Sequence, residues 1–133
     1  MAAVIAALKP LRRPWLWLGL WWIAVLAVVV VCLMPPPPLP PLPDNSDKIE
    51  HLLAYFLLAA GAVQLWRSGR VLLGIGLGLV AMGIGIEWAQ GAWTDTRMAD
   101  PMDALANSLG VVAGMATALT PLRDWLLRAQ ARR

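Results

Sequence analysis

Long apolar runs separated by short polar stretches dominate the chain. A bilayer core of roughly 30 Å requires about 20 apolar residues in a helix. Four segments reach or approach that length, at residues 15–34, 49–66, 71–93 and 102–120. The pattern predicts an all-α membrane protein, a four-helix transmembrane bundle that forms one domain over residues 1–133.

The first apolar run is expected to be retained as a membrane span. It is longer than the roughly 7–15 apolar residues typical of a signal peptide. It ends in Pro35-Pro36-Pro37-Pro38 rather than in a small-residue cleavage site. The Pro-rich outer loop, residues 35–43, favours extended polyproline II. We interpret this loop as a stiff spacer between the first two helices.

Composition supports a membrane location and excludes other classes of protein. Of the 133 residues, 59% are hydrophobic and 14% are charged, against about 25% charged residues in a typical soluble domain. The net charge of +3 does not indicate nucleic-acid binding, because the cations lie in short groups between apolar runs and form no basic face. Cys32 is the only cysteine, which excludes an intrachain disulfide and a thiolate metal cluster.

The distribution of cations predicts the orientation in the membrane. Lys and Arg concentrate in the cytoplasmic segments of membrane proteins. Nine of the eleven cations fall on one side of a four-pass topology, and they are Lys9, Arg12, Arg13, Arg67, Arg70, Arg123, Arg128, Arg132 and Arg133. Both termini are therefore predicted to be cytoplasmic, with Lys48 and Arg97 on the outer side.

Glycine is frequent in the third predicted span, and Gly110 and Gly114 form a GxxxG-like pair in the fourth. Small residues let transmembrane helices approach closely. We therefore expect the spans 71–93 and 102–120 to pack against each other.

Polar and ionisable side chains enter three of the predicted spans near their outer ends. Asp47 and His51 lie four residues apart and share a helix face, as do Glu87 and Gln90, three residues apart. Glu87 precedes Trp93 by six residues and so lies about 9 Å inside the span, where an ionisable group is costly and usually functional. The predicted binding site consists of Asp47, His51, Glu87, Gln90, Arg97, Asp100, Asp103 and Asn107.

Some of these residues also have structural interpretations. Asp47 and Glu50 fit a capping box at the start of the second span, and Asp100 fits the N-cap of the fourth. His51 by itself is more typical of a satisfied interfacial histidine than of a catalytic one. Neither a cap nor solvent explains the three deeper members of the set, which are Glu87, Gln90 and Asn107.

The order and spacing of these residues resemble the VanZ-like family, which is named for a protein associated with teicoplanin resistance. The resemblance rests on D-K-x-x-H at residues 47–51, E-x-x-Q at 87–90 and R-x-x-D-x-x-D-x-x-x-N at 97–107, and it covers about residues 44–116. It implies a small multi-pass protein of the bacterial cytoplasmic (inner) membrane that is connected with the cell envelope. In the named member it also implies glycopeptide-antibiotic resistance.

Three functional hypotheses follow from these residues. The first is a protein that binds a polar or lipid-linked cell-envelope molecule, such as an envelope lipid or glycan precursor, at the outward-facing site, with Arg97 as the anion contact. The second is an intramembrane enzyme that acts on that molecule, with His51 or Glu87 as general base. The third is a structural or regulatory protein without a ligand.

The expected partners and cofactors are few. The lipid bilayer is the expected surrounding, nucleic acid is excluded, and no cofactor is predicted. Carboxylates together with histidine suit divalent ions, but no ligand spacing in the sequence identifies a metal site.

Overall fold

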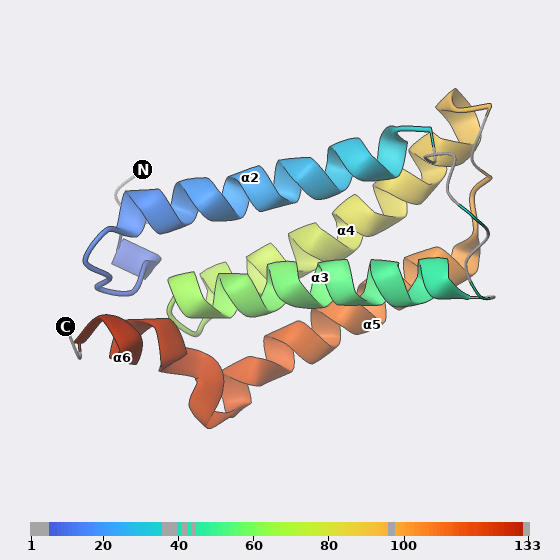
Figure 1. Ribbon diagram of the computed structural model, residues 1–133. Helices are drawn as coiled ribbons and strands as arrows, with labels where there is room; N and C mark the ends of the chain where they lie inside the picture. Colours follow the sequence, from blue (N-terminus) through green and yellow to red (C-terminus); the bar gives the residue numbers. More distant parts are fainter. Residues whose placement is uncertain (1–5, 36–39, 41–42, 44, 96–97, 132–133) are drawn as a thin grey trace.

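Figure 1 shows the computed structural model, which describes residues 6–35, 40, 43, 45–95 and 98–131. Four long helices lie side by side in these residues: α2 (Pro14–Leu33), α3 (Ser46–Leu65), α4 (Arg70–Trp93) and α5 (Pro101–Ala116). Each is long and apolar enough to cross a membrane, α5 together with the 3-10 turn η1 (Thr117–Leu119). The predicted all-α membrane fold with four spans is confirmed. The chain enters and leaves the bundle at the same end (Figure 1).

Proline and glycine mark the ends of the helices. Pro14 occupies the first turn of α2, and the helix ends at Leu33, with Met34 extended before Pro35, because a proline disfavours the helical conformation of the residue that precedes it. The 20 residues of α2 span about 30 Å, the thickness of a bilayer core. Gly69 has φ +131° in the tight turn between α3 and α4, a conformation that residues with a Cβ rarely adopt.

Two short elements follow α5 and η1, and the hydropathy pattern did not predict them. They are the 3-10 turn η2 (Pro121–Asp124) and the helix α6 (Trp125–Ala131). Thr120 starts η2, since its side chain accepts a hydrogen bond from the backbone N–H of Leu122. These elements fold back beneath the bundle at the end where the chain begins (Figure 1).

Lys9 fastens the start of the chain to this C-terminal segment. Its backbone N–H donates to the Leu65 carbonyl at the end of α3 (2.8 Å). Its buried ammonium donates to the Val63 carbonyl (2.7 Å) and to the Arg123 carbonyl, and it pairs with Asp124 (2.9 Å). Lys9 is therefore buried and joins the N-terminal and C-terminal segments, and it is also one of the nine cations predicted to be cytoplasmic.

The expected packing of α4 against α5 is confirmed, since the two helices touch. The more extensive contact is that of α3 with α5, which the glycine pattern did not predict. A Cβ on Gly114 would lie 2.5 Å from the Phe56 carbonyl oxygen and 2.7 Å from Ala59 Cβ. A Cβ on Gly110 would overlap the Leu52 carbonyl oxygen. Gly110 and Gly114 therefore allow α5 to approach the backbone of α3 closely.

Glycines of α4 divide between two faces. A Cβ on Gly74, Gly78 or Gly85 would meet no atom of the described chain within 4 Å, so these residues face outward. Gly83 faces inward, where a Cβ would lie 3.1 Å from Asn107 Cβ and 3.3 Å from the Tyr55 ring. Glycine at position 83 therefore makes room for polar side chains between the helices.

Helix α2 packs on α3 and α4 along a narrow strip. Its buried residues are Trp21 and Val25. The indole N–H of Trp21 donates to the Leu58 carbonyl of α3 (2.9 Å), and the ring packs edge-on against Trp66, with centroids 5.0 Å apart. Most other apolar side chains of α2 are exposed, as expected of a surface that faces lipid.

Candidate functional site

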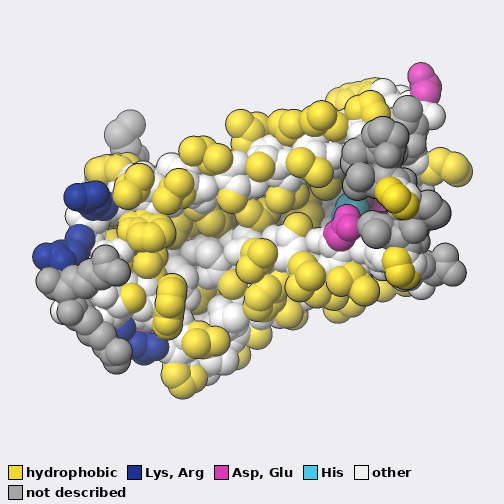
Figure 2. All heavy atoms as spheres, viewed as in Figure 1, with side chains coloured by type: hydrophobic (Ala, Val, Ile, Leu, Met, Phe, Trp, Pro, Cys, Tyr) yellow, Lys and Arg dark blue, Asp and Glu magenta, His cyan; other side chains and the backbone are white. Residues whose placement is uncertain are grey.

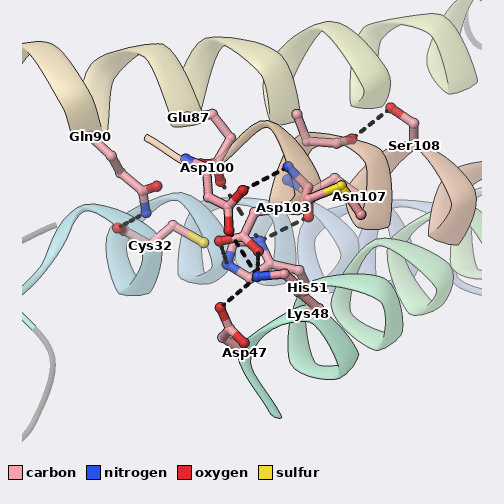
Figure 3. Close-up of polar contacts among 12 residues, drawn as sticks. Cys32, Asp47, Lys48, His51, Glu87, Gln90, Asp100, Asp103, Asn107 and Ser108 are labelled. Carbon is pink, nitrogen blue, oxygen red and sulfur yellow. Dashed lines mark hydrogen bonds and ion pairs between the residues drawn. The ribbon is translucent and has the colours of Figure 1, made fainter. Parts of the chain in front are cut away.

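Charged side chains gather at opposite ends of the bundle. Figure 2 shows Lys and Arg at the end that holds the chain termini, and acids together with the single histidine at the other end. At the acidic end, side chains from α3, α4 and α5 point toward one another (Figure 3). We call these residues the polar cluster, and it consists of Asp47, Lys48, His51, Glu87, Asp100, Asp103 and Asn107.

Lys48 links the N-terminal turns of α3 and α5. Its ammonium lies 2.8 Å from Asp100, 3.2 Å from Asp103 and 3.2 Å from Asp47. The hydrogen bond from Lys48, followed by that from the Met102 backbone N–H, holds the pKa of Asp100 below its usual value. Sequence reasoning noted Lys48 as an outer cation but left it out of the binding set, because the spacing of α3 alone does not reveal that it reaches acids on α5.

His51 occupies the centre of the polar cluster and is buried. Its Nδ1 lies 2.9 Å from Asn107 Oδ1 and 3.9 Å from Glu87 Oε1. Its Nε2 lies 3.8 Å from Asp103 Oδ2. The imidazole therefore has a hydrogen-bond partner at one nitrogen and a carboxylate facing the other.

Glu87 is 95% buried, with an exposed fraction of 5%. Its Oε2 accepts a hydrogen bond from the Asp100 backbone N–H (3.3 Å). Its Oε1 has no hydrogen-bond partner among the described residues, and the same holds for Asn107 Nδ2 and the Tyr55 hydroxyl. Buried polar atoms are nearly always paired in folded proteins, so these three mark a place where the cluster is incomplete by itself.

The structure places the other residues of the predicted binding site in different ways. Asp47 is not the N-cap of α3, because Asn45 holds that position and Asp47 lies in the first turn. Asp100 is both a cap, accepting from Met102 N–H (2.8 Å), and an ion-pair partner of Lys48. Gln90 points away from the cluster and donates to the Cys32 carbonyl at the end of α2 (2.7 Å; Figure 3). Arg97 lies outside the described residues.

An apolar groove runs from the polar cluster along the interface of α2 and α3. Its volume is about 250 Å³. Figure 2 shows the histidine colour inside this hollow. Residues from both helices line it: Ala27, Val28, Val31 and Cys32 from α2, and Glu50, His51, Ala54 and Tyr55 from α3. His51 therefore belongs to both the groove and the polar cluster.

Two groups of side chains have donor atoms close enough together to hold a metal ion. One consists of His51, Glu87 and Asp103, all buried, and the other of Asp47, Asp100 and Asp103, nearer the surface. In each group the donor atoms lie within 4.8 Å of one another. No family model, curated protein or solved structure matches the chain at a significant level.

Proposed function

We propose that this chain binds an amphiphile of the cell envelope, with the apolar part in the α2–α3 groove and the headgroup at the polar cluster. The observation that carries the proposal is the position of His51, which lines the groove and also contacts the cluster. An apolar groove that ends at buried polar groups matches a molecule with an apolar chain and a polar headgroup. Ligand sites generally combine an apolar lining with a few convergent polar groups.

Charge in the cluster indicates the chemistry of the headgroup. Among the described residues, the cluster holds the carboxylates of Asp47, Glu87, Asp100 and Asp103 and a single ammonium, that of Lys48, which pairs with the three aspartates. A further acid, Glu50, lines the groove. Hydrogen-bond acceptors thus outnumber donors there, and a headgroup that carries amine or hydroxyl groups would complete the pairing.

We further propose the membrane and the orientation that the VanZ-like resemblance and the positive-inside rule imply. The basic end would face the cytoplasm of a bacterial cell and the polar cluster would face outward, with both termini inside. A C-terminal fusion should be fluorescent with green fluorescent protein and inactive with alkaline phosphatase. The opposite pair of results would reverse the orientation. A role in glycopeptide resistance belongs to the same proposal and predicts altered teicoplanin sensitivity on expression.

Lipid binding by the purified protein tests the proposed function directly. In detergent with EDTA, native mass spectrometry should show phosphatidylethanolamine bound more strongly than phosphatidic acid, which lacks the amine. Ala54→Trp fills the groove and should reduce that binding about tenfold or more. Leu53→Trp, at the exposed neighbouring position, is the matched control and should bind as the wild type does.

Three results would overturn or change the proposal. If Ala54→Trp binds phosphatidylethanolamine as strongly as the wild type does, the groove does not hold the apolar part of the lipid. If the wild type prefers phosphatidic acid, the cluster does not select a headgroup with an amine. Recovery of a chemically altered lipid after incubation would support the intramembrane enzyme instead, since a binding protein returns the lipid unchanged.

A further inference from the structure

Three buried donor groups from three different helices converge at the centre of the polar cluster. His51 comes from α3, Glu87 from α4 and Asp103 from α5, and their donor atoms lie within 4.8 Å of one another. Figure 3 shows these side chains pointing toward a common centre. All three are at least nine-tenths buried, with exposed fractions of 9%, 5% and 8%.

Among the described residues, hydrogen bonds do not satisfy all the donor atoms of His51, Glu87 and Asp103. Glu87 Oε1 is buried without a partner there and lies 3.9 Å from His51 Nδ1. With Asn107 Oδ1 as acceptor at 2.9 Å, His51 Nδ1 carries the ring proton, and the lone pair of Nε2 then faces Asp103 Oδ2 at 3.8 Å. A lone pair opposite a carboxylate is unfavourable in a buried site unless a cation lies between them.

Lys48 does not supply that cation. Its ammonium is bound to Asp47, Asp100 and the Oδ1 atom of Asp103, on the outer side of the cluster. The second acidic group, Asp47, Asp100 and Asp103, is neutralised in part by these ion pairs, and so it does not call for a metal. The inner group, by contrast, has two carboxylates and an imidazole without a described cation between them.

We propose that His51, Glu87 and Asp103 bind one divalent transition-metal ion of the Zn²⁺ type. An imidazole nitrogen with carboxylate oxygens is a typical donor set for zinc, whereas Mg²⁺ and Ca²⁺ prefer oxygen ligands throughout. Three protein ligands leave one position of a tetrahedral zinc site open. Two ligand atoms of a tetrahedral zinc site with bonds of about 2.0–2.2 Å lie about 3.3–3.6 Å apart. His51 Nε2 and Asp103 Oδ2 are 3.8 Å apart, so they need to approach by only a few tenths of an ångström.

The neighbours of the three ligands resemble the outer support of known metal sites. Histidine ligands usually donate their second ring N–H to a carbonyl or carboxylate, as His51 does to Asn107 Oδ1. Ligating carboxylates are usually hydrogen-bonded in turn, as Glu87 is through Oε2 to the Asp100 backbone N–H. Asn107 is thereby a positioning residue for the imidazole.

The metal site does not depend on the proposed lipid-binding function, and the two can be tested apart. Zn²⁺ binding is measured on EDTA-treated, dialysed protein in detergent without added lipid, by isothermal titration and metal analysis. One Zn²⁺ per chain is expected, with little response to Mg²⁺. Ala54→Trp should still bind Zn²⁺, because it alters the groove and leaves the three ligands in place.

Single substitutions assign the ligands. Glu87→Gln and His51→Ala should each weaken Zn²⁺ binding about 100-fold or more. Asp47→Asn, which removes an acid of the outer group, is the matched control and should bind as the wild type does. Because a ligand variant can fail to fold, the wild type supplies a second test: Co²⁺ should give the visible absorption bands of a low-coordinate site with nitrogen and oxygen ligands, and Zn²⁺ should displace them.

The results that would overturn the inference are clear. Absence of saturable Zn²⁺ binding by the folded wild type would show that the centre is completed in another way, for example by a proton on Nε2. Equal loss of Zn²⁺ binding in Asp47→Asn and Glu87→Gln would move the site to the outer acids. If the wild type binds Zn²⁺ but no lipid, the proposed lipid-binding function is wrong and the metal site is still supported.

Discussion

Gly114→Ala tests the contact on which the arrangement of the bundle depends. The added Cβ would lie 2.5 Å from the Phe56 carbonyl oxygen, 2.7 Å from Ala59 Cβ and 2.9 Å from the Ala60 backbone nitrogen, whereas ordinary contacts begin near 3.4 Å. Two of these three atoms belong to the backbone of α3, so no side chain can move aside. Helix α5 must therefore retreat from α3 by about 1 Å, since 3.4 − 2.5 = 0.9.

Overpacking of this kind costs about 1–3 kcal/mol, and replacing a helical glycine by alanine returns roughly 0.5–1 kcal/mol. The expected net loss in the free energy of unfolding is about 1–2 kcal/mol. The same retreat would stretch the His51–Asn107 hydrogen bond from 2.9 Å to beyond hydrogen-bonding distance, because Asn107 is carried on α5.

Intrinsic tryptophan fluorescence during heating in detergent measures this effect. Gly78→Ala is the matched control, because an added Cβ there meets no described atom within 4 Å and should leave the melting temperature unchanged or slightly raised. Gly114→Ala should melt several degrees lower than both. If the two variants melt together, α3 and α5 do not approach as closely as the structure shows, and the reasoning fails.

Lys48→Met removes the shared cation of three acids but keeps an apolar stem of similar length, and it should lower the melting temperature in the same assay. Asp124→Asn tests the ion pair with Lys9, which holds the pKa of Asp124 below its usual value. That stabilisation is complete above the unfolded pKa of about 4 and is lost as pH falls through the lower folded value, so Asp124→Asn should flatten the fall in melting temperature below pH 4. Gln90→Leu removes the hydrogen bond that joins α4 to the Cys32 carbonyl of α2 and should accelerate limited proteolysis at the outer end of α2, while Trp93→Leu, at an exposed position of α4, should not.

Hydropathy predicted the four spans because lipid imposes the same requirement on every spanning helix. It placed the start of the second span at residue 49, whereas α3 begins at Ser46. The earlier turn contains Asp47 and Lys48, which an apolar pattern excludes and which the fold accommodates by pairing them at the end of the bundle. The short helix α6 was missed for a related reason, since seven residues are too few to give a hydropathy signal.

The glycines predicted that α4 and α5 pack together, but not that α5 makes its closest approach to α3. Helix α4 is the richest in glycine, yet Gly74, Gly78 and Gly85 face outward, whereas Gly110 and Gly114 on α5 make the close approach. Composition shows that a helix has small residues but not which neighbour they meet. That depends on how all the helices pack together, which involves pairs such as Lys9 and Asp124 at opposite ends of the chain.

Spacing along one helix predicted which polar residues share a face, and the structure brings His51, Glu87, Asp103 and Asn107 together as neighbours. The same spacing was insufficient for Gln90. It lies one turn beyond Glu87, and that turn carries its amide to the Cys32 carbonyl at the end of α2. The spacing of His51, Glu87 and Asp103 along the sequence likewise did not indicate a metal site, because the three residues come from three different helices.

The packing of α2 connects these observations with function. Helices α3 and α5 form a frame that glycine backbone contacts hold close, and this frame fixes the geometry of the polar cluster. Two hydrogen bonds join helix α2 to its neighbours, one from Trp21 to the Leu58 carbonyl of α3 and one from Gln90 of α4 to the Cys32 carbonyl near the outer end of α2. The groove lies between those two attachments. Under the function proposed above, a polar site held by α3 and α5 beside the sparsely attached α2 would let an amphiphile enter from the membrane without disturbing the residues proposed to bind its headgroup.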